Sequence, residues 1–404
     1  MGLATVNILG NKTSLATDNV YPSSATPITN CCIHSFGPPT CALDIQGDTV
    51  SMSYWLLLRT EASSSSVQLW FFSNVELSTW VLSTFICHDC CSARPGYVPL
   101  GARDQVLHDL PLSVFKGIRC REVHLQGRNG AKLSGILVHR DDFAEEDIEV
   151  VLAYFQGKFG HSEILPSQIH PVEIGNAGNP LQRIPIFQHL CKSIPPCHYP
   201  KTAILAIAPR SYWKSTPRWP TQPGVIQDYC DTVHYALREF PAARVILYGH
   251  SLGGAAAICT LNKLQQSRTN TPFNPCFDRI RGLVLENTFT SIPAMVRALY
   301  PQRWLPYRYL APLAFDRWDF LAALKSHVGH DTVLGRISRN MLVLVSEHDE
   351  VVPQDMGVRI FKLATQGCHP NGTELVKIPK ALHEDAWTRK MWTDELRKYI
   401  LRVT

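Results

Sequence analysis

Short apolar runs alternate with longer stretches of mixed polarity from about residue 120 onward. Runs rich in Val, Ile and Leu without polar interruptions are typical of strands buried on both faces of a parallel sheet. Runs of this kind, with polar residues only near their ends, are 148–154, 203–207, 244–249, 281–286 and 340–346, and a further strand is expected over 373–379. Helical segments are expected between them, notably over 223–239, 251–266 and 388–402. This pattern predicts an α/β protein with a doubly wound, mostly parallel sheet that helices cover on both sides.

Two alternating runs at the beginning of this region predict an antiparallel hairpin that opens the sheet. The runs cover 121–125 and 132–138, and the sequence Gly127-Arg-Asn-Gly130 lies between them. Because Asn-Gly favours the positive backbone angles of a tight turn, the two strands are expected to pair directly.

Residues 1–91 show no sustained helical or strand period, and they are poor in charge and rich in Ser, Thr, Cys and Trp. We therefore expect a poorly ordered region over 1–91 and a folded domain over 92–404. The membrane-span candidate is 67–87, which has the right length, although Asn74 and Glu76 near its middle oppose insertion by roughly a few kcal/mol together. A misassigned chain start is an alternative, and the opening residues do not resemble a cleaved signal peptide.

The composition and the short motifs argue against several classes of function and of binding site. The net charge is +5 without a tract of Lys or Arg, so nucleic-acid binding is not indicated. The 13 cysteines are odd in number and scattered, which argues against a disulfide framework. Cys87-His-Asp-Cys90-Cys91 has no second ligand pair at a suitable spacing, so we expect no zinc site there, and reversible acylation is the alternative. Glycine motifs for dinucleotides or phosphates are lacking, and no cofactor or metal is expected.

One pentapeptide carries the clearest chemical signal. The apolar run that begins at Arg244 ends in Gly249-His250-Ser251-Leu252-Gly253. A serine on a sharp turn between strand and helix stands clear of the sheet edge, and glycine two residues to either side lets strand and helix approach. Ser251 is therefore the candidate nucleophile, and the Leu252 N–H is a candidate donor to an oxyanion.

The base and the acid that such a serine needs occur later in the chain, each just beyond an expected strand. Asp349 follows the run 340–346 and is the candidate acid that orients the imidazole and stabilises its cation. Glu347 and Glu350 are rivals that the sequence does not rank. His383 follows the last expected strand and is the candidate general base.

The order Ser251, Asp349, His383 on alternating strands and helices resembles the α/β-hydrolase superfamily. From about residue 92 onward the chain is similar to its Bem46-like branch, to which the ABHD13-like proteins are related. Four motifs in the same order carry the resemblance: Gly175-Asn-Ala-Gly-Asn179, Ala208-Pro-Arg-Ser-Tyr-Trp-Lys-Ser215, Leu285-Glu-Asn-Thr-Phe289 and His383-Glu-Asp-Ala-Trp387. The resemblance implies the α/β-hydrolase fold with a helical cap after the sixth strand, over about 288–335.

One departure from the family concerns the oxyanion hole. In the relatives the third strand runs directly into a His-Gly-Asn-Ala-Gly-Asn loop, so the resemblance makes Asn176 the second oxyanion donor. Here Gln156 stands in place of the histidine, and the insert 158–174 separates the two parts of the motif. We interpret the insert as a retained intron translated in frame or a recent insertion; it threatens the placement of Asn176 but not that of Leu252. An ordinary turn before a helix is the alternative for 175–179.

Aromatic residues crowd into the stretch where the cap is expected. They include Tyr300, Trp304, Tyr307, Tyr309, Phe315, Trp318 and Phe320, among Arg297, Arg303, Arg308 and Arg317. These residues either form an apolar acyl pocket with a basic rim or pack the cap onto the sheet. The segment 210–215 likewise either lines the mouth of the pocket or packs a loop.

Together these features predict a serine hydrolase that acts through an acyl-enzyme on ester or thioester bonds of acyl chains. The alternatives are a serine peptidase or amidase and, from another class, a catalytically impaired membrane-associated scaffold, which the insert and Gln156 would favour. The expected partners are a lipid-like acyl substrate, an acylated protein and a membrane surface, without nucleic acid. The expected location is the endomembrane or plasma membrane, with the cytoplasm as the alternative.

Overall fold

The computed structural model describes residues 3–9, 12–16, 43–45, 48–50, 54–60, 66–73, 104–157, 179–195, 197–266, 275–302, 309, 311, 316–328, 330–366 and 372–404. Contacts between residues divide the chain into two compact units, Met1–Leu82 and Ser83–Thr404. The expected division at residue 91, and poor order before it, remain predictions.

The first unit contains strands although its sequence shows no strand period. They are β1 (Leu3–Leu9), β2 (Lys12–Ala16), β3 (Leu43–Ile45), β4 (Asp48–Val50), β5 (Tyr54–Thr60) and β6 (Ser66–Ser73). An antiparallel sheet has the order β2-β1-β6-β5, and β3 pairs with β4. β6 includes the first residues of the candidate membrane segment 67–87, whose remainder lies outside the described residues. Among the helices that the structure describes, none has both the length and the apolar character to cross a membrane.

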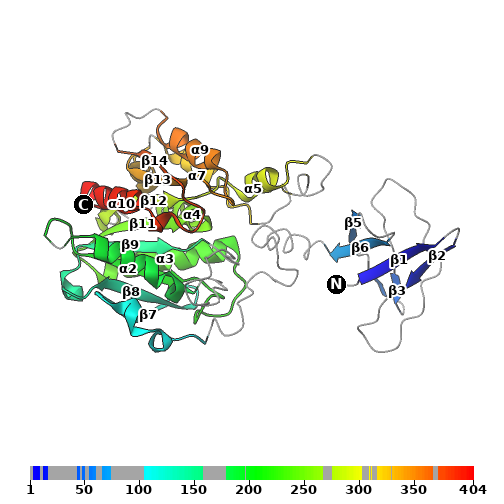
Figure 1. Cartoon of the computed structure of the whole chain (residues 1–404), viewed down its shortest axis with the longest axis horizontal. Helices are drawn as coiled ribbons and strands as arrows, with labels where there is room; N and C mark the ends of the chain where they lie inside the picture. Colours follow the sequence, from blue (N-terminus) through cyan, green and yellow to red (C-terminus); the bar gives the residue numbers. More distant parts are fainter. Residues whose placement is uncertain are drawn as a thin grey trace. The chain divides into compact units, whose positions relative to one another are not determined.

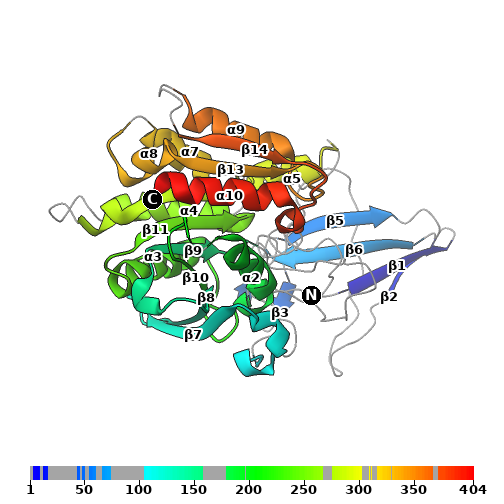
Figure 2. The same ribbon diagram turned by 60° about the vertical axis from the view of Figure 1, so that its left-hand side comes forward.

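An eight-stranded sheet forms the centre of the second unit (Figure 1 and Figure 2). Its strands are β7 (Ile118–Gln126), β8 (Lys132–Arg140), β9 (Val150–Phe155), β10 (Thr202–Ala208), β11 (Arg244–His250), β12 (Ile280–Glu286), β13 (Met341–Ser346) and β14 (Glu374–Ile378). Their order across the sheet is β14-β13-β12-β11-β9-β10-β8-β7. β8 is antiparallel to both of its neighbours, and the other pairs are parallel. The predicted mostly parallel sheet is confirmed, and β7 and β8 are the predicted hairpin.

Helices cover both faces of this sheet, and Figure 2 shows α2 and α10, which lie on the same face. One face packs on α3 (Gln222–Glu239), α4 (Leu252–Gln266), α5 (Ile292–Leu299), α7 (Phe320–His327), α8 (Val333–Ser338) and α9 (Gln354–Ala364), and the other on α2 (Ile184–Ser193) and α10 (Lys390–Val403). Short 3-10 helices connect these elements: η1 (Leu107–Asp109), η2 (Leu112–Phe115), η3 (Glu145–Asp147), η4 (Pro180–Arg183), η5 (Pro275–Arg279) and η7 (Ala386–Thr388). Every residue of β9, β10 and β13 is buried, which explains their unbroken apolar sequences.

The chain between β12 and β13 makes a helical excursion at the place of the expected cap. α5 follows β12, and α7 and α8 precede β13. Trp318 and Phe320 are buried in the core, so these two aromatic side chains pack the excursion onto the sheet, whereas Tyr309 is 65% exposed. Trp304 and Phe315 lie outside the described residues, as does Tyr307.

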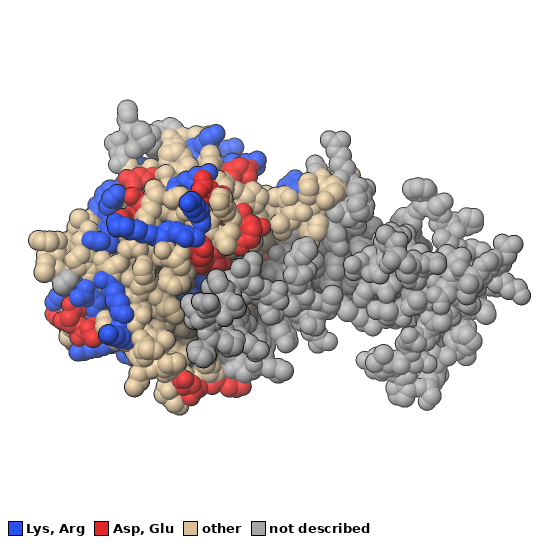
Figure 3. Space-filling view, viewed as in Figure 1, with Lys and Arg blue, Asp and Glu red and all other residues tan. Residues whose placement is uncertain are grey.

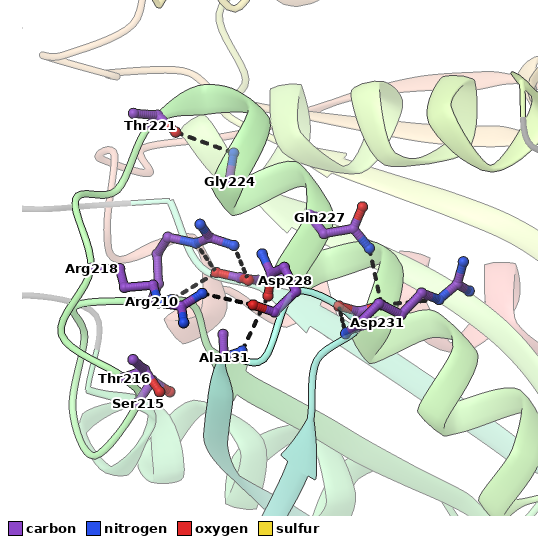
Figure 4. A network of polar contacts seen from close by, with 12 residues as sticks. Ala131, Arg210, Ser215, Thr216, Arg218, Thr221, Gly224, Gln227, Asp228 and Asp231 are labelled. Carbon is purple, nitrogen blue, oxygen red and sulfur yellow. Dashed lines mark hydrogen bonds and ion pairs between the residues drawn. The ribbon is translucent and has the colours of Figure 1, made fainter.

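The loop between β10 and α3 is fixed by a buried ion pair (Figure 4). Arg210 donates from Nε and Nη2 to the two carboxylate oxygens of Asp228, at 2.9 and 2.7 Å, and its backbone N–H donates to the same carboxylate at 2.8 Å. The two side chains are only 9% and 1% exposed. Ser215 hydrogen-bonds to the backbone of both β10 and β8. The contacts of 210–215 are therefore those of a packed loop.

Asp231 lies one helical turn after Asp228 and holds the hairpin turn, as Figure 4 shows in part. Its carboxylate accepts the Arg128 backbone N–H at 3.1 Å and the Gln227 side-chain amide at 3.0 Å. The first helix after β10 thus anchors both the β10–α3 loop and the β7–β8 turn.

Basic and acidic side chains are interspersed over the described part of the face that Figure 3 shows. On α10, for example, Lys398 pairs with Glu395 at 2.6 Å. Exposed pairs of this kind contribute about 0–1 kcal/mol each to stability. The stability of this unit therefore rests on its two apolar cores and its buried polar contacts.

The Arg210–Asp228 pair should dominate the stability of the β10–α3 loop. Replacing Asp228 with asparagine leaves a buried guanidinium without its counter-ion, so we expect Asp228→Asn to lower the free energy of unfolding by about 3–5 kcal/mol. The measurement is urea denaturation. Glu145→Gln is the matched control, because the Arg121–Glu145 pair has similar geometry but side chains 40% and 32% exposed, and it should lose about 1 kcal/mol at most. Equal losses in the two variants would contradict the prediction.

Candidate active site

Ser251 lies on the turn between β11 and α4, and its backbone φ is 54°. Positive φ is strained for a residue with a Cβ, and such strain is typical of a nucleophile elbow. The turn is held on both sides, because Ser251 N–H donates to Glu286 O at 2.8 Å and Gly254 N–H donates to Ser251 O at 3.1 Å. Ser251 is therefore fixed at the edge of the sheet where the parallel strands have their carboxyl ends.

Three backbone segments meet at this turn without room for side chains. A Cβ on Gly253 would lie 1.9 Å from the last carbonyl oxygen of β9, and one on Gly249 would lie 2.4 Å from the backbone of α4. A Cβ on Gly157 would lie 1.7 Å from His250 O and 2.6 Å from Ser251 Cβ. The requirement for glycine around Ser251 is thus steric, and it extends to the chain that leaves β9.

His383 and Asp349 come together in the loops after β14 and β13. Nδ1 of His383 lies 3.0 and 2.9 Å from the two carboxylate oxygens of Asp349. Both side chains are 1% exposed, so the pair is shielded from water. Because the parallel strands end at one edge of the sheet, both loops belong to the edge that carries Ser251.

The geometry ranks the three acids that the sequence could not rank. Asp349 Oδ1 accepts two backbone N–H groups of its own loop at 2.9 and 2.7 Å, besides facing the imidazole. Glu350 Oε2 accepts the backbone N–H of His383 at 3.0 Å, and Glu347 Oε2 accepts that of Lys380 at 3.0 Å. Of the three, Asp349 is the carboxylate in contact with the imidazole.

The main chain of His383 is also fixed by side chains from other strands. Its carbonyl oxygen accepts from Asn287 Nδ2 at 2.9 Å and faces His250 Nε2 at 3.0 Å. Asn287 Oδ1 accepts the Ser346 N–H at 2.8 Å, and Asn287 itself has a positive φ of 49°. Asn287 therefore joins β12, β13 and the loop of His383.

Two buried titratable groups lie directly beside the turn. Burial lowers the pKa of His250 to about 4, so its imidazole is neutral at pH 7. Burial raises the pKa of Glu286 to about 7, although a hydrogen bond from Tyr248 opposes the rise. Trp392 Nε1 also donates to Glu286 Oε1, at 3.1 Å.

His250, His383 and Glu384 each have a possible metal-ligand atom, and these atoms lie within 4.8 Å of one another. Each side chain already has a protein partner. His250 bonds to the His383 carbonyl, His383 to Asp349, and Glu384 to Arg183. These contacts use one polar atom of each side chain, and Nδ1 of His250 and Oε1 of Glu384 have no hydrogen-bond partner among the described residues.

The two candidate oxyanion donors differ in what the structure describes. Leu252 is the first residue of α4, where backbone N–H groups have no acceptor within the helix, so its N–H is suited to bind an anion. Asn176 and the insert 158–174 lie outside the described residues. Gln156 is described and buried, at the end of β9.

Three residues that contact this site were not predicted from the sequence. Asn287 was noted only within a motif, and its positive φ is not visible in a sequence. Glu384 is adjacent to His383, so its position was a signal, but its partner Arg183 is 201 positions away. Glu286 is the last residue of an apolar strand, and that unusual place for a carboxylate could have identified it.

Several curated proteins are similar to this chain, among them the following three. Protein bem46 of Schizosaccharomyces pombe is 29% identical over 213 residues, 52% of this chain and 59% of bem46. The α/β-hydrolase domain-containing protein WAV2 of Arabidopsis thaliana is 28% identical over 224 residues, 52% of this chain and 62% of WAV2. Lysophosphatidylserine lipase ABHD12 of Danio rerio is 28% identical over 170 residues, 41% of each chain. The matched regions thus span less than two thirds of these relatives.

No protein-family profile matches the chain. Among solved structures, Pyrococcus furiosus esterase PF2001 aligns with a TM-score of 0.48 at 14% identity, over 73% of this chain and 94% of the esterase. The sheet order described above, together with the curated relatives, confirms the predicted α/β-hydrolase fold.

The two buried titratable groups should act on stability with opposite signs. The pKa of His250 is ordinarily 6.5 and is lowered to about 4 in the folded chain. Between these pH values His250 is protonated in the unfolded chain but neutral in the folded one, so its contribution to stability is lost as pH falls. The pKa of Glu286 is ordinarily 4.5 and is raised to about 7 in the folded chain. Between these pH values Glu286 is ionised in the unfolded chain but keeps its proton in the folded one, so its contribution to stability is lost as pH rises.

We therefore expect His250→Gln and Glu286→Gln to change the pH dependence of stability in opposite directions between pH 4.5 and 6.5. Relative to the unsubstituted chain, the free energy of unfolding should gain a falling slope in His250→Gln and a rising slope in Glu286→Gln. Each change should reach at most about 1.4 kcal/mol per pH unit, which corresponds to one proton. Urea denaturation across this range measures both, and identical slopes in all three proteins would refute the assignment.

Proposed function

We propose that this chain, an α/β-hydrolase-domain protein related to bem46, is a serine hydrolase that cleaves ester or thioester bonds of acyl-chain substrates. The observation that carries the proposal is the buried contact between His383 and Asp349 at the edge of the sheet where a strained turn presents Ser251. These are the three residue types of a nucleophile, a base and an orienting acid.

In the proposed mechanism His383 takes the proton of Ser251 through Nε2, since Nδ1 is bound to Asp349. The Ser251 oxygen attacks the carbonyl carbon, and the electron pair of the carbonyl bond moves to its oxygen. His383 then gives the proton to the leaving alcohol or thiol as the acyl-enzyme forms. Water repeats the sequence: His383 takes its proton, the hydroxide oxygen bonds to the acyl carbon, and Ser251 leaves with the proton returned.

The negative oxygen formed in each step needs fixed hydrogen-bond donors. We assign the Leu252 N–H to this role, because it belongs to the residue after the nucleophile and opens α4. The Asn176 N–H is the proposed second donor. Gly157 supports this assignment, because it brings the chain leaving β9 into contact with the Ser251 turn.

The proposed substrate class is an acyl ester of a lipid-like molecule, and an acylated protein is a further candidate. One similar protein is named a lysophosphatidylserine lipase, which favours a lipid ester over a peptide. The aromatic excursion after β12 would supply apolar surface for the acyl chain. We further propose that the protein works at a membrane surface, where such substrates reside.

Covalent labelling tests the nucleophile directly. We expect the full chain to react with a fluorophosphonate probe and to hydrolyse p-nitrophenyl butyrate, and both reactions should be lost in Ser251→Ala. The readouts are in-gel fluorescence and nitrophenolate release. Label that persists in Ser251→Ala would show that another residue is the nucleophile. A folded chain that takes no label would favour the scaffold alternative.

A second prediction separates Asp349 from its neighbour. Asp349→Asn should lower kcat by about 10³–10⁴-fold with little change in folding, because the amide no longer favours the reactive tautomer or stabilises the imidazolium. Glu350→Gln is the matched control: its side chain contacts the His383 backbone, so we expect a loss of about tenfold or less. Steady-state kinetics on p-nitrophenyl butyrate gives both values. The reverse ranking would make Glu350 the acid.

A further inference from the structure

A second buried ion pair lies against the proposed catalytic base. Arg183 Nη1 is 2.7 Å from Glu384 Oε2, and the two side chains are 11% and 21% exposed. Glu384 directly follows His383, whereas Arg183 is the last residue of η4 at the entrance to α2. The pair therefore ties the loop of His383 to a segment 201 positions earlier in the chain.

The carboxylate of this pair lies close to two imidazoles. Ligand atoms of His250, His383 and Glu384 lie within 4.8 Å of one another. Burial opposes ionisation of Glu384, but Arg183, followed by the two histidines, outweighs burial and lowers the pKa of the carboxyl well below its ordinary value. Glu384 is thus an anion at neutral pH, and Arg183 is its counter-ion.

Such a pair has a chemical consequence for a base that must gain and lose a proton. Asp349 already supplies one negative charge to the His383 imidazole. A second carboxylate without a counter-ion would hold the proton on His383 too firmly, and an unpaired Arg183 would oppose protonation. With both present, the positive charge of Arg183 opposes the effect of the Glu384 carboxylate on the imidazole.

We propose that Arg183 and Glu384 are positioning residues for the reaction of Ser251, which fasten the His383 loop to the start of α2 and balance the charge around the imidazole. This inference rests on the proposed function.

The charged and titratable groups around His383 come from several elements. They are His250 of β11, Glu286 of β12, Asp349 and Glu350 of the loop after β13, Glu384 and Asp385 of its own loop, and Arg183 of η4. A test must change Glu384 and Arg183 while leaving the others in place.

The test is the pH profile of kcat/KM for p-nitrophenyl butyrate, whose acid limb reports the protonation of the base in the free enzyme. Glu384→Gln removes a charge that stabilises the imidazolium, so the acid limb should move to lower pH by about one unit. Arg183→Met removes a charge that destabilises the imidazolium, so the limb should move to higher pH by a similar amount. The double variant should return close to the position of the unsubstituted chain. A purely structural role would not produce opposite shifts.

Two charge-conserving variants, and a control variant at an ion pair away from the site, complete the experiment. Glu384→Asp and Arg183→Lys keep the charges, so their acid limbs should stay in place while kcat falls by about tenfold from the altered reach. If the charge-removing variants fail to fold, this pair of variants still tests the charge balance, because an acid limb that moves with both charges kept would overturn it. Glu145→Gln breaks the part-exposed Arg121–Glu145 pair away from the site and should leave the profile unchanged.

The outcomes separate the two proposals. Ser251-dependent hydrolysis with an acid limb that stays fixed, or moves the same way in Glu384→Gln and Arg183→Met, overturns the role of the pair and leaves the proposed function intact. Hydrolysis that is absent, or that persists in Ser251→Ala, overturns the proposed function and with it the role of the pair.

Discussion

The backbone contact around Ser251 is the constraint on which the rest of the site depends. β9, β11 and the first turn of α4 approach so closely that glycine is required at Gly157, Gly249 and Gly253. The strained φ of Ser251 persists because this packing and the hydrogen bond to Glu286 O leave no relaxed alternative. A rigid support of this kind fixes the position of a serine oxygen to well under an ångström, which oriented chemistry requires.

The loop that carries His383 is held by side chains from neighbouring segments at this edge of the sheet. Asn287 and His250 hold the carbonyl of His383, and Glu350 holds its N–H. The imidazole then needs only Asp349 to set its orientation. At the carboxyl edge of the sheet, residues in or just after three strands, β11, β12 and β13, thus hold the main chain and the imidazole of His383.

Local pattern was sufficient for most of the fold and for the turn at Ser251. Nearly continuous apolar runs identified the buried strands, because a strand that is buried on both faces is apolar at almost every position. The first unit was different: its strands lack the alternation that a one-sided sheet would produce. Ranking Asp349 above Glu350 needed coordinates, because neighbouring residues in a loop point in different directions. The Arg183–Glu384 contact joins distant segments, and no local pattern encodes such a pairing.

Glu286 contacts both the nucleophile turn and the core. Its carbonyl oxygen accepts the Ser251 N–H, and its carboxyl accepts hydrogen bonds from Tyr248 and Trp392. The indole N–H of Trp392 is therefore hydrogen-bonded to a titratable carboxyl of a residue that contacts the nucleophile turn. Indole emission responds to a hydrogen-bonded carboxyl that gains or loses a proton. Among the nine tryptophans of the chain, Trp392 is therefore one whose emission should respond to a proton gained or lost beside the nucleophile turn.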